Sequence, residues 1–248
     1  MQVETPKHRI LEDSGALDAP RRFIGRPSLQ PKKSPTGTSW LIPVLLIGLN
    51  LIPDLAGVVR LLGLASGELI RSQNARFMTL PLPVSVHIVS ASLFGVIGAF
   101  QFWPRFLGSD AHWHRLAGRI MVPCGMITSM SGLWMNQFYP YAENDGFLLY
   151  CFRSIFGFGM LFCLVFGLDS IRRRDFDQHR NWMMCGYAIG LGAGTQALTQ
   201  LPWMLAVGLP GELPRAMLMG AAWIINLLVA QWILRRGRLY WQEMPFSD

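Results

Sequence analysis

Two histidines occupy matching positions in the sequence, each followed by an arginine near the start of an apolar run. His114 precedes Arg115, and His179 precedes Arg180. Neutral imidazole is an ordinary axial ligand of haem iron, and a guanidinium pairs well with a carboxylate such as a haem propionate. The two histidines therefore suit a b-type haem held between two helices, with both imidazoles bound to the iron.

Further polar residues surround the two histidines. Together they form what we call the inner polar layer: Gln101, His114, Arg115, Arg119, His179 and Arg180. This layer also suits an anionic ligand, such as a phosphate or a lipid headgroup, because arginines and helix N-terminal amides attract anions. The sequence also allows a structural interpretation, in which these groups hydrogen-bond one another, water and headgroups and hold two helical hairpins at the membrane surface.

A second set of polar residues falls nearer the opposite face. We call it the outer polar layer: Asp54, His87, Arg153 and Gln196. Polar groups inside a membrane are costly, so each is a functional candidate. His87 paired with Asp54 or Arg153 suits proton transfer, because imidazole titrates near neutral pH. The plainer alternatives are that His87 only packs, that a helix ends near Pro53 and leaves Asp54 in water, and that Arg153 reaches the surface or pairs with Asp54.

The sequence carries none of the usual patterns of soluble enzymes. Serine-nucleophile, P-loop, HExxH and EF-hand motifs are absent, so we expect that the chain is not an enzyme on its own. The four cysteines form neither a CxxC pair nor a CxxCH haem-attachment motif: Cys124, Cys151, Cys163 and Cys185. They predict buried thiols rather than a disulfide framework or a cysteine metal site.

Six apolar runs must position these residues. The chain has 248 residues, of which 51% are hydrophobic and 15% charged, so it is poor in charge for a soluble domain. Each run has about 20 residues, enough to cross about 30 Å of hydrocarbon as a helix. The runs are 40–59, 84–103, 116–137, 147–168, 182–201 and 216–234. Because hydrocarbon leaves no partner for free backbone amides, the sequence predicts an all-α bundle of about six transmembrane helices.

The basic residues predict how the chain is threaded through the membrane. Most of the 22 lie on one side of the six runs, which places both termini in the cytoplasm by the positive-inside rule. The net charge of +7 therefore reflects topology, and we expect no nucleic-acid partner. We predict a disordered, basic, proline-rich arm over 1–38, a membrane domain over 39–236 and a short cytoplasmic tail over 237–248.

Glycines recur at close-packing intervals in two of the runs. One run contains overlapping GxxxG steps and another a seven-residue repeat, at Gly186, Gly190 and Gly194 and at Gly118, Gly125 and Gly132. Small residues let a neighbouring backbone approach, so besides lipid the partners we expect are other membrane subunits or a second copy of the chain. The functions left open are a haem redox module, a small transporter or lipid-handling protein, and an assembly subunit.

Several long motifs resemble one family. The segments HIVSASLFGVIGAFQF, WHRLAGRIMVP, IRRRDFDQHRNWM and YAIGLGAGTQALTQLPW resemble a bacterial family of predicted multi-pass membrane proteins, domain of unknown function 2306, over residues 81–236. The resemblance implies a helical protein of the bacterial inner membrane and no particular activity. It also implies importance for His87, Gln101, His114, Arg115, Arg119, His179, Arg180 and Trp182.

Overall fold

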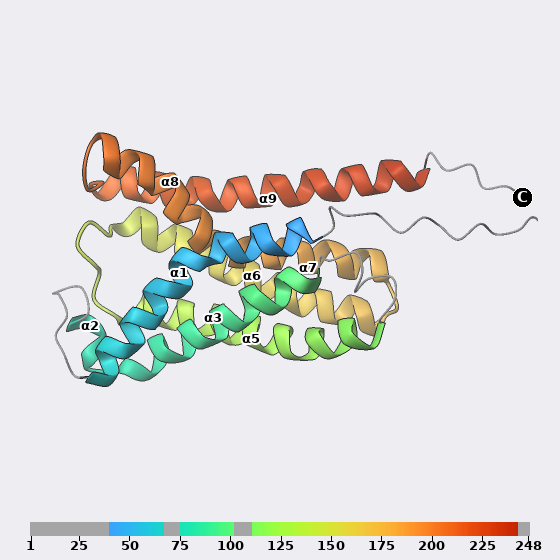
Figure 1. Cartoon of the computed structure of the whole chain (residues 1–248), viewed down its shortest axis with the longest axis horizontal. Coiled ribbons are helices and arrows are strands. Elements are labelled where there is room, and N and C mark those ends of the chain that lie inside the picture. The colour runs from blue at the N-terminus through green and yellow to red at the C-terminus, as the bar shows by residue number, and fades with distance from the viewer. Residues whose placement is uncertain (1–39, 67–74, 102–110, 243–248) are drawn as a thin grey trace, which may run out of the picture. The chain divides into compact units, whose positions relative to one another are not determined.

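The protein is built from helices. The computed structural model describes residues 40–66, 75–101 and 111–242, and it contains no strand within these ranges. The helices follow one another as α1 (Leu41–Ser66), α2 (Ala75–Met78), α3 (Pro81–Gln101), α5 (Ala111–Phe138), α6 (Phe147–Arg172), α7 (Phe176–Gly190), α8 (Gly192–Ala206) and α9 (Glu212–Gln242) (Figure 1). The predicted all-α class is confirmed. The predicted arm and residues 243–248 of the predicted tail lie outside the described residues, and the domain boundaries remain a prediction.

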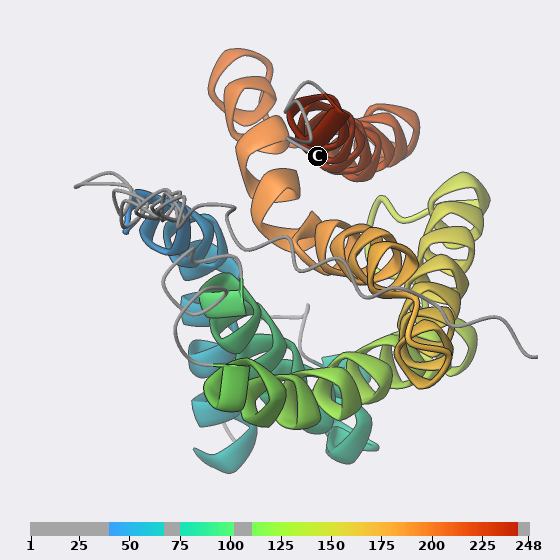
Figure 2. The same ribbon diagram turned by 90° about the vertical axis from the view of Figure 1, so that its right-hand side faces the viewer.

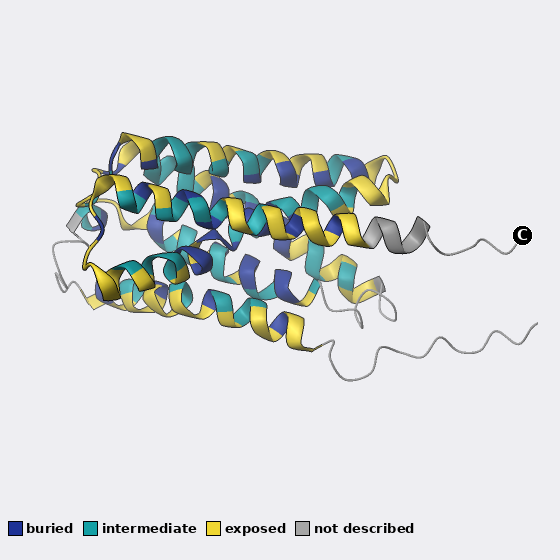
Figure 3. Ribbon diagram, turned by 90° about the horizontal axis from the view of Figure 1, so that it is seen from above, coloured by how far each residue is buried: buried dark blue, intermediate teal, exposed yellow. Residues whose placement is uncertain are grey.

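Four of these helices are long and apolar enough to cross a membrane: α1, α3, α6 and the Glu212–Arg236 part of α9. Most of their residues are not buried, as the teal and yellow parts of the ribbon in Figure 3 show. Only 17% of the most apolar stretch of α1 is buried. Such an exterior is costly in water and favourable in hydrocarbon. The chain is therefore a membrane protein with several apolar helices, while six crossings remain a prediction.

The helix α1 is longer than the run that predicts it. The run ends at residue 59, but α1 continues through Pro53 to Ser66. A proline inside a helix removes one backbone hydrogen bond, here that to the carbonyl of Leu49 four residues earlier, and membrane helices tolerate this loss. Asp54 consequently lies in the middle of α1 and not in water beyond its end.

The fifth run was expected to form one continuous helix, and this expectation is wrong. The helix is interrupted between α7 and α8, and Figure 2 shows α8 turning away from the line of α7. Gly190 and Gly192 are poor helix formers at this point. The carbonyl of Ala188, near the end of α7, accepts a 3.0 Å bond from Nδ2 of Asn226. The side-chain oxygen of Asn226 accepts a 2.8 Å bond from the hydroxyl of Thr195 in α8. One side chain of α9 therefore hydrogen-bonds to both α7 and α8 where the helix is interrupted.

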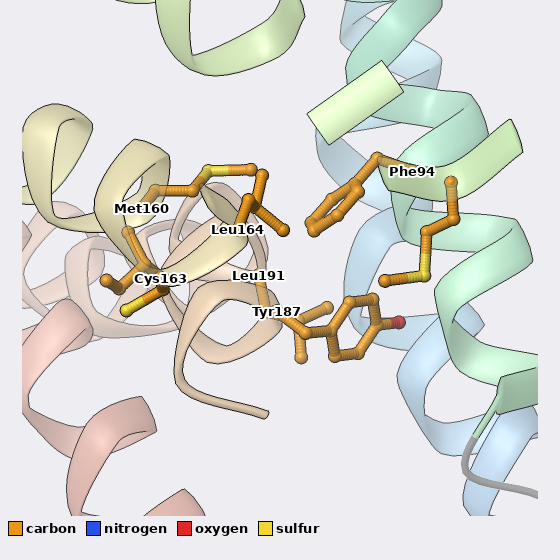
Figure 4. Packing of buried hydrophobic residues seen from close by; sticks show 8 residues of the cluster. Phe94, Met160, Cys163, Leu164, Tyr187 and Leu191 are labelled. Carbon is orange, nitrogen blue, oxygen red and sulfur yellow. The ribbon is translucent and has the colours of Figure 1, made fainter. Parts of the chain in front are cut away.

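An apolar core joins α3, α5, α6 and α7. It contains the residues labelled in Figure 4, namely Phe94, Met160, Cys163, Leu164, Tyr187 and Leu191, together with Met121 and Ile189. The helices pack in the pairs α3 with α5, α5 with α6 and α6 with α7, while α5 and α7 make little direct contact with each other. The core therefore holds α5 and α7 in place through their shared neighbours.

The glycine stripes mostly receive side chains instead of a neighbouring backbone. A Cβ at Gly125 or at Gly190 would lie 2.6 or 2.5 Å from the ring of Phe94, so both make room for that ring. Gly194 differs, because a Cβ there would lie 2.2 Å from the carbonyl oxygen of Leu49. Close backbone packing thus occurs at Gly194, where α8 meets α1.

Candidate functional site

The inner polar layer lies where α5 and α7 begin. His114 is in the first turn of α5 and His179 in the first turn of α7, and both helices start at the same end of the bundle (Figure 1). The two imidazoles are close enough to interact electrostatically. The fold thus gathers at one end two histidines that are far apart in the sequence.

The ring of His179 is fixed by one hydrogen bond. Its Nδ1 lies 2.7 Å from the carbonyl oxygen of Gly167 in α6. A carbonyl oxygen only accepts, so Nδ1 must carry the proton and Nε2 keeps its lone pair. Histidines that bind metals commonly donate their other N–H to a backbone carbonyl in this way.

His114 has polar groups that find no partner. Its Nδ1 is buried and makes no hydrogen bond with any described residue. The backbone oxygen of His114 accepts a 3.1 Å bond from Nε2 of Gln101, whose Oε1 is likewise buried and unbonded. One turn along α5, a Cβ at Gly118 would meet nothing within 4 Å. A buried polar atom without a partner is a candidate contact for a ligand.

The arginines of the inner polar layer lie on the exposed side of this end. Arg115, Arg119 and Arg180 are exposed, and within the described ranges none forms an ion pair. The start of α7 is capped by Asp175, which accepts a 3.0 Å bond from the backbone N–H of Gln178. The arginines therefore remain available to pair with an anionic group.

The outer polar layer is spread over several partners. His87 of α3 faces α5, where its Nδ1 lies 3.0 Å from the oxygen of Thr128 and 3.1 Å from Oγ of Ser131. Gln196 of α8 faces α9, with its Nε2 3.5 Å from the oxygen of Met219. These two residues bond to separate helices, so the structure does not bring the outer polar layer together as one site.

Asp54 is held between α1 and α3. Its Oδ1 accepts a 2.7 Å bond from Ser92, and it forms no ion pair with a described residue. One turn earlier in α1, buried Asn50 lies against Gly95, whose carbonyl accepts a 2.8 Å bond from Tyr187. Asp54 therefore belongs to a polar group at the middle of the bundle.

Arg153 pairs with Asp145 and not with Asp54. Asp145, in the loop before α6, accepts a 2.7 Å bond from Arg153 and a 2.8 Å bond from Arg215, and its side chain is 2% exposed. Burial alone would raise the pKa of Asp145, but hydrogen bonds and positive charge from the two arginines outweigh burial and hold it below its ordinary value. Sequence reasoning missed Asp145, because nothing in the sequence shows that the starts of α6 and α9 meet.

The profile of a family described as "Predicted membrane protein (DUF2306)" matches residues 84–234. The chain belongs to this family. The match runs from α3 to α9 of this DUF2306 protein and includes both histidines of the inner polar layer, and it confirms the resemblance found in the sequence. No curated protein and no solved structure matches the chain.

Possible metal ligands, namely histidine, cysteine and acidic side chains, occur across the described ranges 40–66, 75–101 and 111–242. These ranges hold no group of three or more histidine, cysteine and acidic residues placed to bind a metal ion. Two histidines suffice for a haem, because the porphyrin supplies the other four ligands to iron.

Proposed function

We propose that this DUF2306 protein is a b-type haem protein of the bacterial inner membrane, with His114 and His179 as the iron ligands. The observation that carries the proposal is the hydrogen bond from Nδ1 of His179 to Gly167, which leaves Nε2 free to bind. The unbonded Nδ1 of His114 and the open space at Gly118 support a ligand between α5 and α7. Haem at this position supplies one-electron redox chemistry.

The surrounding residues have distinct roles in the proposal. Gly167 fixes the tautomer and orientation of His179, and Gln101 ties the end of α3 to the start of α5. Arg115, Arg119 and Arg180 pair with the propionates, since a guanidinium binds a carboxylate strongly. The apolar core beyond the layer excludes water. We further propose six crossings, with α7 and α8 together forming the fifth, and a cytoplasmic position for both termini and for the inner polar layer.

The absorbance spectrum of the full chain, expressed with added haem precursor and purified in detergent, tests the proposal. We expect a Soret band in the wild type that is lost or strongly reduced in His114→Ala and in His179→Ala. His112→Ala is a matched control, because His112 is an exposed residue in the same turn of α5. A wild type without a Soret band, or a band that both variants keep, would refute the proposal.

A small transporter is the second candidate. Two observations favour it. The helix of the fifth apolar run is interrupted between α7 and α8, and Asp54 lies midway along α1. Broken helices and central acids mark ion sites in many transporters. This candidate predicts that proteoliposomes dissipate an imposed pH gradient faster than empty liposomes, and that Asp54→Asn abolishes the difference whereas Asp169→Asn does not. Equal rates for wild-type and empty liposomes would exclude proton transport as the activity.

A further inference from the structure

Arginines also gather at the opposite end of the bundle. Arg60 lies toward the end of α1, Arg76 in α2, and Arg153 and Arg215 near the starts of α6 and α9, which share one end in Figure 1. Arg76 is within electrostatic range of the other three and of Asp145. The orientation proposed above makes this the outer face, where arginine is disfavoured in bacterial membrane proteins. Such a concentration calls for a compensating charge.

The acids at this end do not compensate all four arginines. Asp145 is taken by Arg153 and Arg215, as described above. The other described acids near these helix ends, Glu143 and Glu212, are exposed and form no ion pair. Within the described ranges, Arg60 and Arg76 are therefore left without a carboxylate partner.

Arg60 and Arg76 converge on one aromatic ring. Their guanidinium carbons lie 4.9 Å and 4.5 Å from the centre of the Phe77 ring. The ring cannot easily move away, because Phe77 is 4% exposed and packs edge-on against Tyr139 at 5.0 Å. Tyr139 is itself held by its hydroxyl, which donates a 2.5 Å bond to the oxygen of Leu80. The two guanidinium groups thus lie close to one ring that is itself held in place.

Both guanidinium groups keep unused donors. The Nε atoms of Arg60 and Arg76 are buried and bond to no described residue, although Nη1 of Arg76 donates to the oxygen of Pro140 at 3.3 Å. Buried donors without acceptors are costly, and two cations over one ring repel each other. A bound anion relieves the repulsion between the two cations. A phosphate group suits the pair best, because its several oxygens accept forked hydrogen bonds from two planar guanidinium groups.

We propose that Arg60 and Arg76 bind a phosphate group at the outer surface of the membrane, in a site beside Phe77. The phosphate belongs either to a phospholipid headgroup or to a small soluble anion, and the chemistry of recognition is the same for both. This site is separate from the inner polar layer and does not depend on haem binding.

Binding is measured on the full chain in detergent, by following its melting temperature while inorganic phosphate is added at constant ionic strength. In parallel, native mass spectrometry counts the phosphatidylglycerol molecules retained by the same protein. Each charged hydrogen bond to a phosphate accounts for about a tenfold change in affinity or more, so Arg60→Gln and Arg76→Gln should each weaken binding by at least about tenfold. Arg236→Gln is the matched control, because Arg236 also lies over a ring, that of Trp232, in the last part of α9.

Each outcome decides between the alternatives. Stabilisation by inorganic phosphate that both variants lose identifies a small-anion site, whereas lipid retention alone that both variants lose identifies a headgroup site. Arg60→Lys keeps the charge but not the planar fork of donors. If this variant folds and binds more weakly, the weaker binding of the glutamine variants is not caused by unfolding. A wild type that binds neither probe, or glutamine variants that bind like Arg236→Gln, would overturn the proposal.

Discussion

Replacing Asp145 by Asn should weaken the attachment of α6 to α9. The substitution keeps the size of the side chain but removes the charge that Arg153 and Arg215 share. Breaking a buried ion pair by removing one partner costs about 3–5 kcal/mol. The arginine side chains are 28% exposed, so water compensates part of this loss, and we expect about 2–4 kcal/mol.

The melting temperature of the purified protein in detergent measures this effect. For a chain of this size each kcal/mol corresponds to about 2–4 °C, so Asp145→Asn should melt about 4–16 °C below the wild type. Asp169→Asn is the matched control, because Asp169 forms its 2.6 Å pair with Arg173 at a surface where the side chains are 41% and 75% exposed. An exposed pair contributes about 0.5 kcal/mol, so the control should shift by at most about 2 °C.

The stabilisation that the Asp145 carboxylate provides should fall as the pH is lowered. The pKa of Asp145 is lowered in the folded protein, so the stabilisation is complete above the unfolded value of about 3.9 and is lost as the pH falls through the folded value. The gap between wild type and Asp145→Asn should therefore be full at neutral pH and shrink below about pH 4. Equal melting of the Asp145 and Asp169 variants, or a gap that persists in acid, would refute the reasoning.

Three further substitutions test other parts of the fold. Gly194→Ala places a Cβ against the Leu49 carbonyl and should cost about 1–3 kcal/mol in thermal unfolding, whereas Gly48→Ala, where a Cβ meets nothing within 4 Å, should be neutral or stabilising. Asn226→Ala leaves the Ala188 carbonyl and the Thr195 hydroxyl without partners, so hydrogen exchange should speed up at the α7–α8 break; unchanged exchange there would count against the capping role. His87→Ala removes the contacts to Thr128 and Ser131 and should lower the melting temperature while the Soret band is retained; loss of the band would assign His87 to the haem site.

Hydrophobic patterning predicted the class of the fold and the position of every long helix. Runs of apolar residues are sufficient for this, because a membrane helix must satisfy its own backbone and leaves few alternatives. The pattern could not predict the break between α7 and α8. Gly190 and Gly192 weaken a helix anywhere, but the side chain that bonds the Ala188 carbonyl at the break comes from Asn226 in α9, which is distant in the sequence.

In the candidate sites, too, the sequence predicted the positions of residues along the helices but not the contacts between separate helices. His114 and His179 each precede an apolar run in the sequence, and the structure places both at the same end of the bundle (Figure 1). The partners of Arg153 and Asp54 could not be predicted, because Asp145 and Ser92 meet them only through packing of separate helices. Likewise, the cluster at Phe77 joins Arg60 of α1 to Arg76 of α2 by contacts that spacing alone does not reveal.

The haem content of the purified protein tests the central proposal most directly. The pyridine haemochrome assay, applied to full-length protein expressed with added haem precursor, gives the ratio of b-type haem to protein. We expect haem in equimolar amount with the chain for the wild type and for His112→Ala, and a small fraction of that for His114→Ala and His179→Ala. Absence of haem from the wild type, or undiminished haem in both site variants, would contradict the assignment of the inner polar layer as a haem site.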